Sequence, residues 1–290
     1  MIEDQANGLR RLVRQEQLPR EAPPRSGARL ILVTGGKGGT GTTTIAFGLA
    51  AAAAGQGRQV VLVDANSHGG DIALMAKSDE RWTIADVLSS RATVAEAIQP
   101  GAGGMRVLPG AWAQENLDNV PGAAHARLLD QLRSLEPEAD DVFFDGGSGF
   151  GRCLRQFWHA AHVVAVVTTP ALSSVMDTYA TIKLLARGRT VPPVYTIVNH
   201  AASARIAGDV HARLARSCRR FLGMDLLHGG HVSEHGGWFG QTKRMDPPAL
   251  TAGKIGREIG GIGEILMTAA RAVKMEAGPS WQTAAERLTA

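Results

Sequence analysis

The sequence predicts an α/β protein with a doubly wound, mostly parallel sheet that is covered by helices on both faces. Three observations favour this fold. Apolar segments typical of strands alternate with segments typical of helices from residue 29 onward. The strand at 163–168 is apolar throughout, as expected of a strand buried on both faces of a parallel sheet. A glycine-rich stretch at 35–44 separates the first strand from the first helix, where a phosphate-cradling loop would lie.

The elements follow one another without an internal repeat. We expect strands at 30–34, 60–64, 105–108, 142–145, 163–168, 194–199 and, more weakly, 226–228. We expect helices at 43–56, 124–135, 151–160, 173–186 and 203–221. Right-handed crossovers between such strands would place a ligand at the carboxyl ends of the strands.

The length and composition fit one large α/β domain or two small ones in a cytoplasmic protein. The chain has 290 residues, 44% of them hydrophobic, and a net charge of +4. This mildly basic charge permits contact with nucleic acid or acidic lipid but does not require either. The two cysteines show no metal-ligand spacing and are expected to be reduced thiols. The acidic start of the chain argues against a signal peptide.

We expect four parts: a helix at 1–18, a proline-rich linker at 19–28, the main domain at 29–275 and a tail at 276–290. In the first part Ile2, Ala6, Leu9 and Val13 recur at helical spacing. A short helix on such a linker is either a disordered terminus or an arm that binds a partner, and the residue pattern alone favours neither.

The glycine-rich stretch matches the phosphate-loop pattern G-x-x-x-x-G-[K]-[ST] with one departure. Thr42 occupies the position where a phosphate-binding lysine is expected, and the next residue, Thr43, occupies the Mg²⁺-binding position. A glycine-rich turn that only joins a strand to a helix is the alternative. The residues expected to contact a nucleotide here are Gly36, Gly38, Gly39, Thr40, Gly41, Thr42, Thr43 and Thr44.

Two aspartates end predicted strands and are candidate metal ligands. Asp64 follows four apolar residues of the second strand, and Asp145 ends a later strand. Either residue alone would be read as a turn or helix-capping aspartate. Together with the glycine loop, Thr43, Asp64 and Asp145 predict a Mg²⁺ site.

These motifs resemble the MinD/ParA ATPases, whose deviant phosphate loop carries an additional lysine that Lys37 matches. The resemblance extends to the FlhG (FleN, YlxH) branch of that family, which governs flagellar number and placement. The matching stretches are D-Q-A-N-G-L-R at 4–10, D-G-G-S-G at 145–149, V-T-T-P at 167–170 and D-T-Y-A-T-I-K-L-L at 177–185. The resemblance implies a P-loop fold that uses ATP and Mg²⁺.

The resemblance also assigns roles to individual residues. Lys37 would reach across a nucleotide-sandwiched homodimer, Asp64 and Asn66 would occupy the catalytic switch positions, and Asn199 would contact adenine. In the N-terminal helix, Gln5, Leu9 and Arg10 would bind an FlhF-type GTPase of the signal-recognition class and stimulate its hydrolysis. The C-terminal helix would be an amphipathic element at the inner face of the membrane, although we favour packing on the sheet.

Two departures from the family pattern affect hydrolysis. Thr42 stands where the family has a lysine, so a positive charge is missing. Asn66 stands where the family has the second aspartate of D-x-D, the residue associated with positioning the attacking water. We therefore expect impaired ATP hydrolysis, with a working ATPase that depends on Lys37 and a scaffold without nucleotide as alternatives. A DNA-partition ATPase shares the fold, but that class lacks the D-Q-A-x-x-L-R arm, so we expect no DNA binding.

Overall fold

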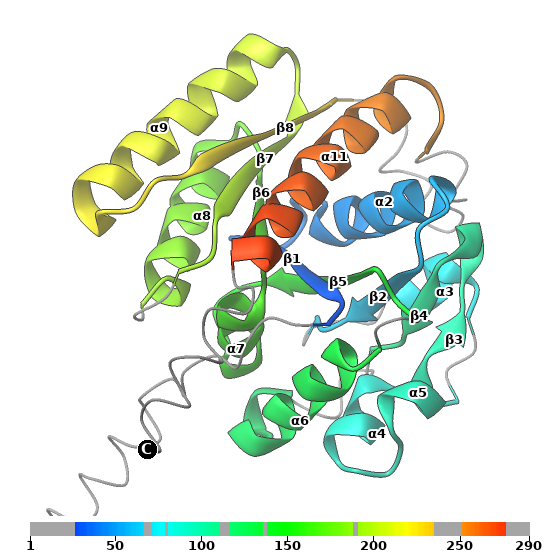
Figure 1. Cartoon of the computed structure of the whole chain (residues 1–290). Helices are drawn as coiled ribbons and strands as arrows, with labels where there is room; N and C mark the ends of the chain where they lie inside the picture. Colours follow the sequence, from blue (N-terminus) through cyan, green and yellow to red (C-terminus); the bar gives the residue numbers. More distant parts are fainter. Residues whose placement is uncertain are drawn as a thin grey trace, which may run out of the picture.

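One eight-stranded sheet forms the centre of the molecule (Figure 1). The computed structural model describes residues 27–66, 71–78, 81–110, 117–135, 138–187, 191–234 and 251–276. The strand order is β3-β4-β2-β5-β1-β6-β7-β8, and all neighbours run parallel except β3 and β4. The predicted doubly wound, mostly parallel sheet is therefore confirmed.

The strands are β1 (Arg29–Gly35), β2 (Val60–Asp64), β3 (Gln99–Pro100), β4 (Arg106–Leu108), β5 (Asp141–Ser148), β6 (Val163–Thr168), β7 (Val194–Ala201) and β8 (Leu227–Ser233). The helices are α2 (Thr42–Gly55), α3 (Asp71–Ala76), α4 (Ile84–Leu88), α5 (Val94–Ala97), α6 (Gly122–Arg133), α7 (Arg152–Ala160), α8 (Leu172–Leu185), α9 (Ala204–Leu222) and α11 (Gly253–Glu276). Two short 3-10 turns lie at Ala102–Gly104 and Leu117–Asn119.

Helices cover both faces of the sheet (Figure 1). Successive residues of a strand point to opposite faces, so the inner strands must be apolar at every position. In β1, Ile31 and Val33 pack in the layer with α2, α3 and α11, whereas Leu30 and Leu32 pack in the layer with α4 to α9. This two-sided burial explains why β1, β2, β5 and β6 could be recognised from uninterrupted apolar runs.

The C-terminal helix α11 packs on the sheet, as we expected in preference to a membrane element. Its apolar residues Ile255, Ile259, Ile262 and Leu266 are each 5% exposed or less. They contact the layer formed by α2 and the sheet. Among the residues that the structure describes, we find no helix with the length and apolar character that a membrane span needs.

Several short elements were not predicted. These are β3 and helices α3, α4 and α5, which have two to six residues each. Strand β8 is longer than the expected 226–228. Ala28, which we assigned to the linker, is buried and donates its N–H to the carbonyl oxygen of Arg133. The predicted arm at 1–18, linker residues 19–26 and the tail beyond Glu276 lie outside the described residues.

Candidate functional site

The predicted phosphate loop joins β1 to α2 at the carboxyl end of the sheet. Gly41 precedes the helix with φ 84°, in the left-handed region that glycine adopts without strain. A Cβ atom on Gly41 would also lie 2.4 Å from Nδ2 of Asn199. The first N–H groups of a helix have no partner within it, and the first turn of α2 contains no acidic residue. This helix start is therefore suited to an anion such as a phosphate.

Thr42 is buried beneath the loop and does not reach outward. Its Oγ1 lies 3.1 Å from Oγ1 of Thr40, whose hydroxyl in turn lies 3.1 Å from the carbonyl oxygen of Lys37. A lysine at this position would extend its ammonium group towards a bound phosphate. The threonine instead makes its contact within the loop and contributes no positive charge.

Lys37 lies on the outside of the loop. Its side chain is exposed, and its Nζ is 3.5 Å from Oγ of Ser173 in the first turn of α8. At that length the hydrogen bond is weak. The ammonium group is therefore directed along the surface between the loop and α8, where a ligand or a second chain can meet it.

Asp64 and Asp145 lie side by side, because β2 and β5 pair in a register that places the two residues opposite each other. Both are fully buried. Burial raises the pKa of Asp64 well above its ordinary value, and the neighbouring Asp145 raises it further. Burial also raises the pKa of Asp145, to about 6. Two adjacent buried carboxylates destabilise each other unless a cation or a proton lies between them.

The donor atoms around this pair fit Mg²⁺. Asp145 accepts a hydrogen bond from the N–H of Gly147 through Oδ1, but its buried Oδ2 has no hydrogen-bond partner among the described residues. The hydroxyl of Thr43 lies close enough to lower the pKa of Asp145. No set of three histidine, cysteine or acidic side chains converges in the described part of the chain. This agrees with Mg²⁺, which usually takes one or two carboxylates and completes its shell with waters and phosphates.

Asn66 lies next to this carboxylate pair. Its backbone N–H donates to Oδ1 of Asp64 at 3.2 Å, and its side chain packs against Gly147. A further acidic residue, Asp71 at the start of α3, raises the pKa of both Asp64 and Asp145. Asp71 was not predicted as a site residue, although an acidic residue at the start of a helix shortly after Asp64 and Asn66 was a usable signal.

Asn199 lies near the end of β7 and is directed to the loop. Its Nδ2 donates to the carbonyl oxygen of Thr40 at 2.8 Å, and its Oδ1 accepts from the N–H of His200. The side chain is 4% exposed. The amide therefore holds the loop against β7, whereas the family resemblance assigned it to adenine.

The structure brings the loop residues, Asp64, Asn66, Asp145 and Asn199 to one edge of the sheet. Gln5, Leu9 and Arg10 of the predicted arm lie outside the described residues. One feature was missed: three large apolar side chains, Phe150, Leu172 and Met176, are 59%, 70% and 63% exposed beside this edge. Isolated apolar residues after a strand or at a helix start give no sequence signal for this exposure.

Comparisons with known proteins agree with this geometry. Residues 31–235 match the model of the CobQ/CobB/MinD/ParA nucleotide binding domain. The chain is 31% identical to the antiactivator FleN of Pseudomonas aeruginosa over 70% of this chain and 73% of that protein. It is 27% identical to the flagellum site-determining protein YlxH of Helicobacter pylori over 69% of this chain and 67% of that protein.

Solved structures share the fold. The septum site-determining protein MinD of Pyrococcus horikoshii, complexed with Mg-ADP, superimposes with a TM-score of 0.66 and 22% identity over 85% of this chain and 98% of that chain. MinD of the MinC:MinD complex from Aquifex aeolicus gives a TM-score of 0.64 and 22% identity over 83% of this chain and 96% of that chain.

Proposed function

The chain belongs to the CobQ/CobB/MinD/ParA family of nucleotide-binding domains, and we propose that it is a nucleotide-binding switch that regulates flagellar number or placement. The similarity to FleN and YlxH supports the flagellar assignment. The observation that carries the proposal is the combination at one sheet edge of a glycine loop and two buried, adjacent carboxylates.

We propose that the ligand is ATP or ADP with Mg²⁺. The start of α2 and the loop N–H groups would hold the phosphates. Thr43, Asp64 and Asp145 would hold the metal, directly or through water, and the metal would neutralise charge on the phosphates. The orphan Oδ2 of Asp145 supports this role, because a buried acceptor without a partner is costly unless a ligand satisfies it.

Hydrolysis should be slow. The hydroxyl of Thr42 is engaged with Thr40 inside the loop, so the loop supplies no lysine charge where negative charge develops during phosphoryl transfer. Such charge-assisted contacts contribute about 1.5–3 kcal/mol in a ground state and more in the transition state. Asn66 cannot accept a proton as a carboxylate can. Lys37, on the outside of the loop, is a cation that could approach the phosphates.

Calorimetric titration of the full-length protein with ATP and ADP, with and without Mg²⁺, tests nucleotide binding, and a turnover assay runs alongside. We expect weak, Mg²⁺-dependent binding and little turnover. The double variant Thr42→Lys with Asn66→Asp should raise turnover. Brisk wild-type turnover that is lost in Lys37→Ala would show a working ATPase instead. Absence of any nucleotide binding would favour a scaffold that acts without nucleotide.

We further propose that the N-terminal helix binds and stimulates an FlhF-type GTPase. The D-Q-A-N-G-L-R motif supports this role. A helix of this length is marginal alone in water and would gain order on a partner. Gln5 would help to order the GTPase site, and Leu9 and Arg10 would dock the helix. This activity does not require turnover by the main domain, so it is compatible with Thr42.

A peptide of residues 1–18 should stimulate the cognate GTPase, and Gln5→Ala or Leu9→Ala should abolish the effect. Asn7→Ala is a matched control within the same helix, because Asn7 occupies a variable position of D-Q-A-x-x-L-R and belongs to neither proposed contact. If removal of residues 1–20 from the full-length protein left GTPase stimulation unchanged, the arm would be an ordinary terminus.

Dimerisation through the site edge is part of the same proposal. Phe150, Leu172 and Met176 expose apolar area beside the loop, and Lys37 is directed into the same surface. Burial of this apolar area against a second copy would stabilise the dimer. Sedimentation velocity of wild type and of Leu172→Ser with Met176→Ser should show a dimer that the double variant weakens.

A second candidate function is DNA binding of the partition type, favoured by helix α9. It exposes Arg205, Arg213, Arg216, Arg219 and Arg220. Arg205 pairs with Asp209 and Arg219 with Asp225, while the other three show no ion pair within the described residues. Binding to nonspecific duplex DNA that weakens steeply with salt, and is reduced in Arg213→Glu with Arg216→Glu, would favour this function. We expect no such binding at physiological salt.

A further inference from the structure

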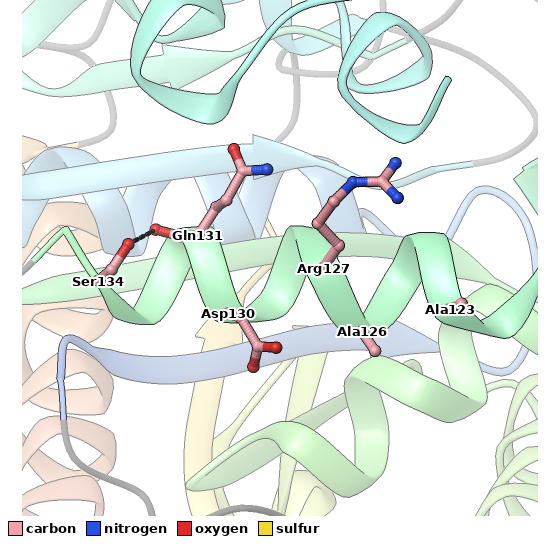
Figure 2. Close-up of a pocket in the computed structure, with 6 residues that line it drawn as sticks. All are labelled: Ala123, Ala126, Arg127, Asp130, Gln131 and Ser134. Atoms are coloured by element: carbon pink, nitrogen blue, oxygen red, sulfur yellow. Dashed lines mark hydrogen bonds between the residues drawn. The ribbon is translucent and has the colours of Figure 1, made fainter. Parts of the chain in front are cut away.

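Helix α6 carries a shallow groove on its outer surface, away from the site edge. The groove has a volume of about 530 Å³ and is lined by Ala123, Ala126, Arg127, Asp130, Gln131 and Ser134 (Figure 2). We call these six residues the α6 groove. The opposite face of α6 packs into the core through Ala124, Leu128 and Leu132. The groove is therefore the outward surface of a helix whose position is fixed from behind.

Two groove residues are fixed by hydrogen bonds to neighbouring helices. Nη2 of Arg127 donates to the carbonyl oxygen of Leu88 at 2.8 Å, at the end of α4. Oε1 of Gln131 accepts from the N–H of Val94 at 2.7 Å, at the start of α5. Arg127 and Gln131 extend from one side of α6 and Asp130 from the other (Figure 2). These two side chains are thus already ordered, which lowers the entropic cost of binding a partner in the groove.

The small residues of the α6 groove permit close approach of another helix. Ala123 is exposed and Ala126 is half-buried, one turn apart. Small side chains at a contact allow short interaxial distances, within the 8–10 Å range of packed helices. Asp130 adds an exposed carboxylate next to the last turn of α6, where it also pairs with Nη1 of Arg133 at 3.4 Å. The negative end of the α6 dipole lies at the same end of the helix. The groove therefore has an apolar end at the alanines and a charged end at Asp130, with the guanidinium of Arg127 between them.

The N-terminal arm is the segment best placed to occupy this groove. The chain enters the described fold beside the last turn of α6, where the N–H of Ala28 donates to the carbonyl of Arg133 at 3.3 Å. The eight residues 19–26 span at most about 28 Å. Helix α6 has 12 residues and is therefore about 18 Å long. Residue 18 can consequently reach any point along α6.

The arm and the groove are complementary when the two helices run in the same direction. Ile2, Ala6 and Leu9 would then lie over Ala123 and Ala126. The basic cluster of the arm, Arg10, Arg11 and Arg14, would lie near the negative end of α6 and near the exposed carboxylate of Asp130, which it would share with Arg133. The reverse direction would place the basic cluster over the alanines and is disfavoured.

We propose that residues 2–18 dock as a helix in the α6 groove and are thereby withheld from the GTPase. The inference rests on the proposed function of the arm, because Leu9 and Arg10 would serve both contacts and cannot make them at once. A docked arm cannot bind the GTPase. The apparent affinity for the GTPase is therefore lowered in proportion to the fraction of chains whose arm is free.

Photo-crosslinking in the full-length chain tests the docking directly. p-Benzoylphenylalanine replacing Ala123, at the end of the groove far from the chain entry, should crosslink within the same chain to residues 2–9. The same group replacing Ala204, an exposed alanine at the start of α9, should give no such product. Mixing light and isotope-labelled chains separates products within one chain from products between two copies. Absence of the product, or a product only between copies, would overturn the proposal.

Release of the arm is the second readout. Ala126→Arg and, separately, Asp130→Lys should raise GTPase stimulation by the full-length protein about three- to tenfold at limiting concentration, since they free a sequestered arm. Ala204→Arg should leave it unchanged. If the crosslink forms but no variant stimulates the GTPase, docking stands and the proposed GTPase role fails. If the arm stimulates but neither crosslinks nor responds to Ala126→Arg, the docking inference fails alone.

Discussion

The two ends of β5 carry buried aspartates in opposite electrostatic situations. Asp141, at the start of the strand, is held by Arg29 Nε at 2.7 Å and Arg58 Nε at 2.5 Å. Asp145, near its other end, faces another carboxylate and has an oxygen without a hydrogen bond among the described residues. Burial raises the pKa of both to about 6, and at Asp141 the neighbouring Arg58 opposes the rise. The first aspartate is paired with two arginines within the fold, whereas the second has no ion pair among the described residues.

The largest expected effect is on stability, at Asp141, which is paired with two arginines. Asp141→Asn should lower the free energy of unfolding by about 3–5 kcal/mol, because it leaves two partly buried guanidinium groups without their carboxylate. Urea denaturation at neutral pH measures it. A loss below about 1 kcal/mol would mean that solvent already compensates these arginines, and the contrast between the two ends would disappear.

The second largest effect is a gain in stability, expected at Asp145. Asp145→Asn should raise the stability of the metal-free protein by about 1–3 kcal/mol at neutral pH, since it removes a buried charge that lies beside Asp64. The same variant should lose the thermal stabilisation that Mg²⁺ with ADP gives to the wild type. Thermal unfolding with and without Mg-ADP measures both. A metal-free variant less stable than wild type would contradict the interpretation of Asp145 as an unsatisfied carboxylate.

The pH dependence sharpens this contrast. The pKa of Asp145 rises from 3.8 to about 6 on folding because of burial, so the native state binds this proton more tightly than the unfolded state. The contribution to stability is complete below the unfolded pKa and is lost as pH rises through about 6. The stability advantage of Asp145→Asn should therefore shrink as pH falls from neutral to about 5. Parallel urea titrations at several pH values would show an unchanged advantage if Asp145 were not responsible.

The smallest effect concerns Asp71, an exposed residue that raises the pKa of both site aspartates. Asp71→Asn should move the pH midpoint of that stability difference downward by roughly a few tenths of a unit, as expected of a solvent-screened charge. Asp86→Asn is unsuitable as a control because Asp86 caps α4. Asp225→Asn is a better control, because Asp225 is exposed and follows α9. Equal shifts in Asp71→Asn and Asp225→Asn would indicate a general charge effect.

Most of the fold could be predicted from the sequence, because strands that are buried on both faces appear as uninterrupted apolar runs, as in β1, β2, β5 and β6. Helices α3 to α5 are too short for a periodic pattern to emerge. The loop, Asp64 and Asp145 were predictable from their position after strands. The arginine contacts of Asp141 join residues 112 and 83 positions apart and leave no local signal. The hydrogen bond between Asn199 and the loop could not be predicted for the same reason, since it joins residues 159 positions apart.

That contact has a mechanical consequence. A single amide fastens the carbonyl of Thr40 to the end of β7, and β7 is bonded on both sides, to β6 and β8. The loop is therefore not a free hinge between β1 and α2 but is anchored to the far half of the sheet. Displacement of the loop therefore requires either loss of the hydrogen bond between Asn199 and Thr40 or a matching movement of β7, which its pairing with β6 and β8 resists.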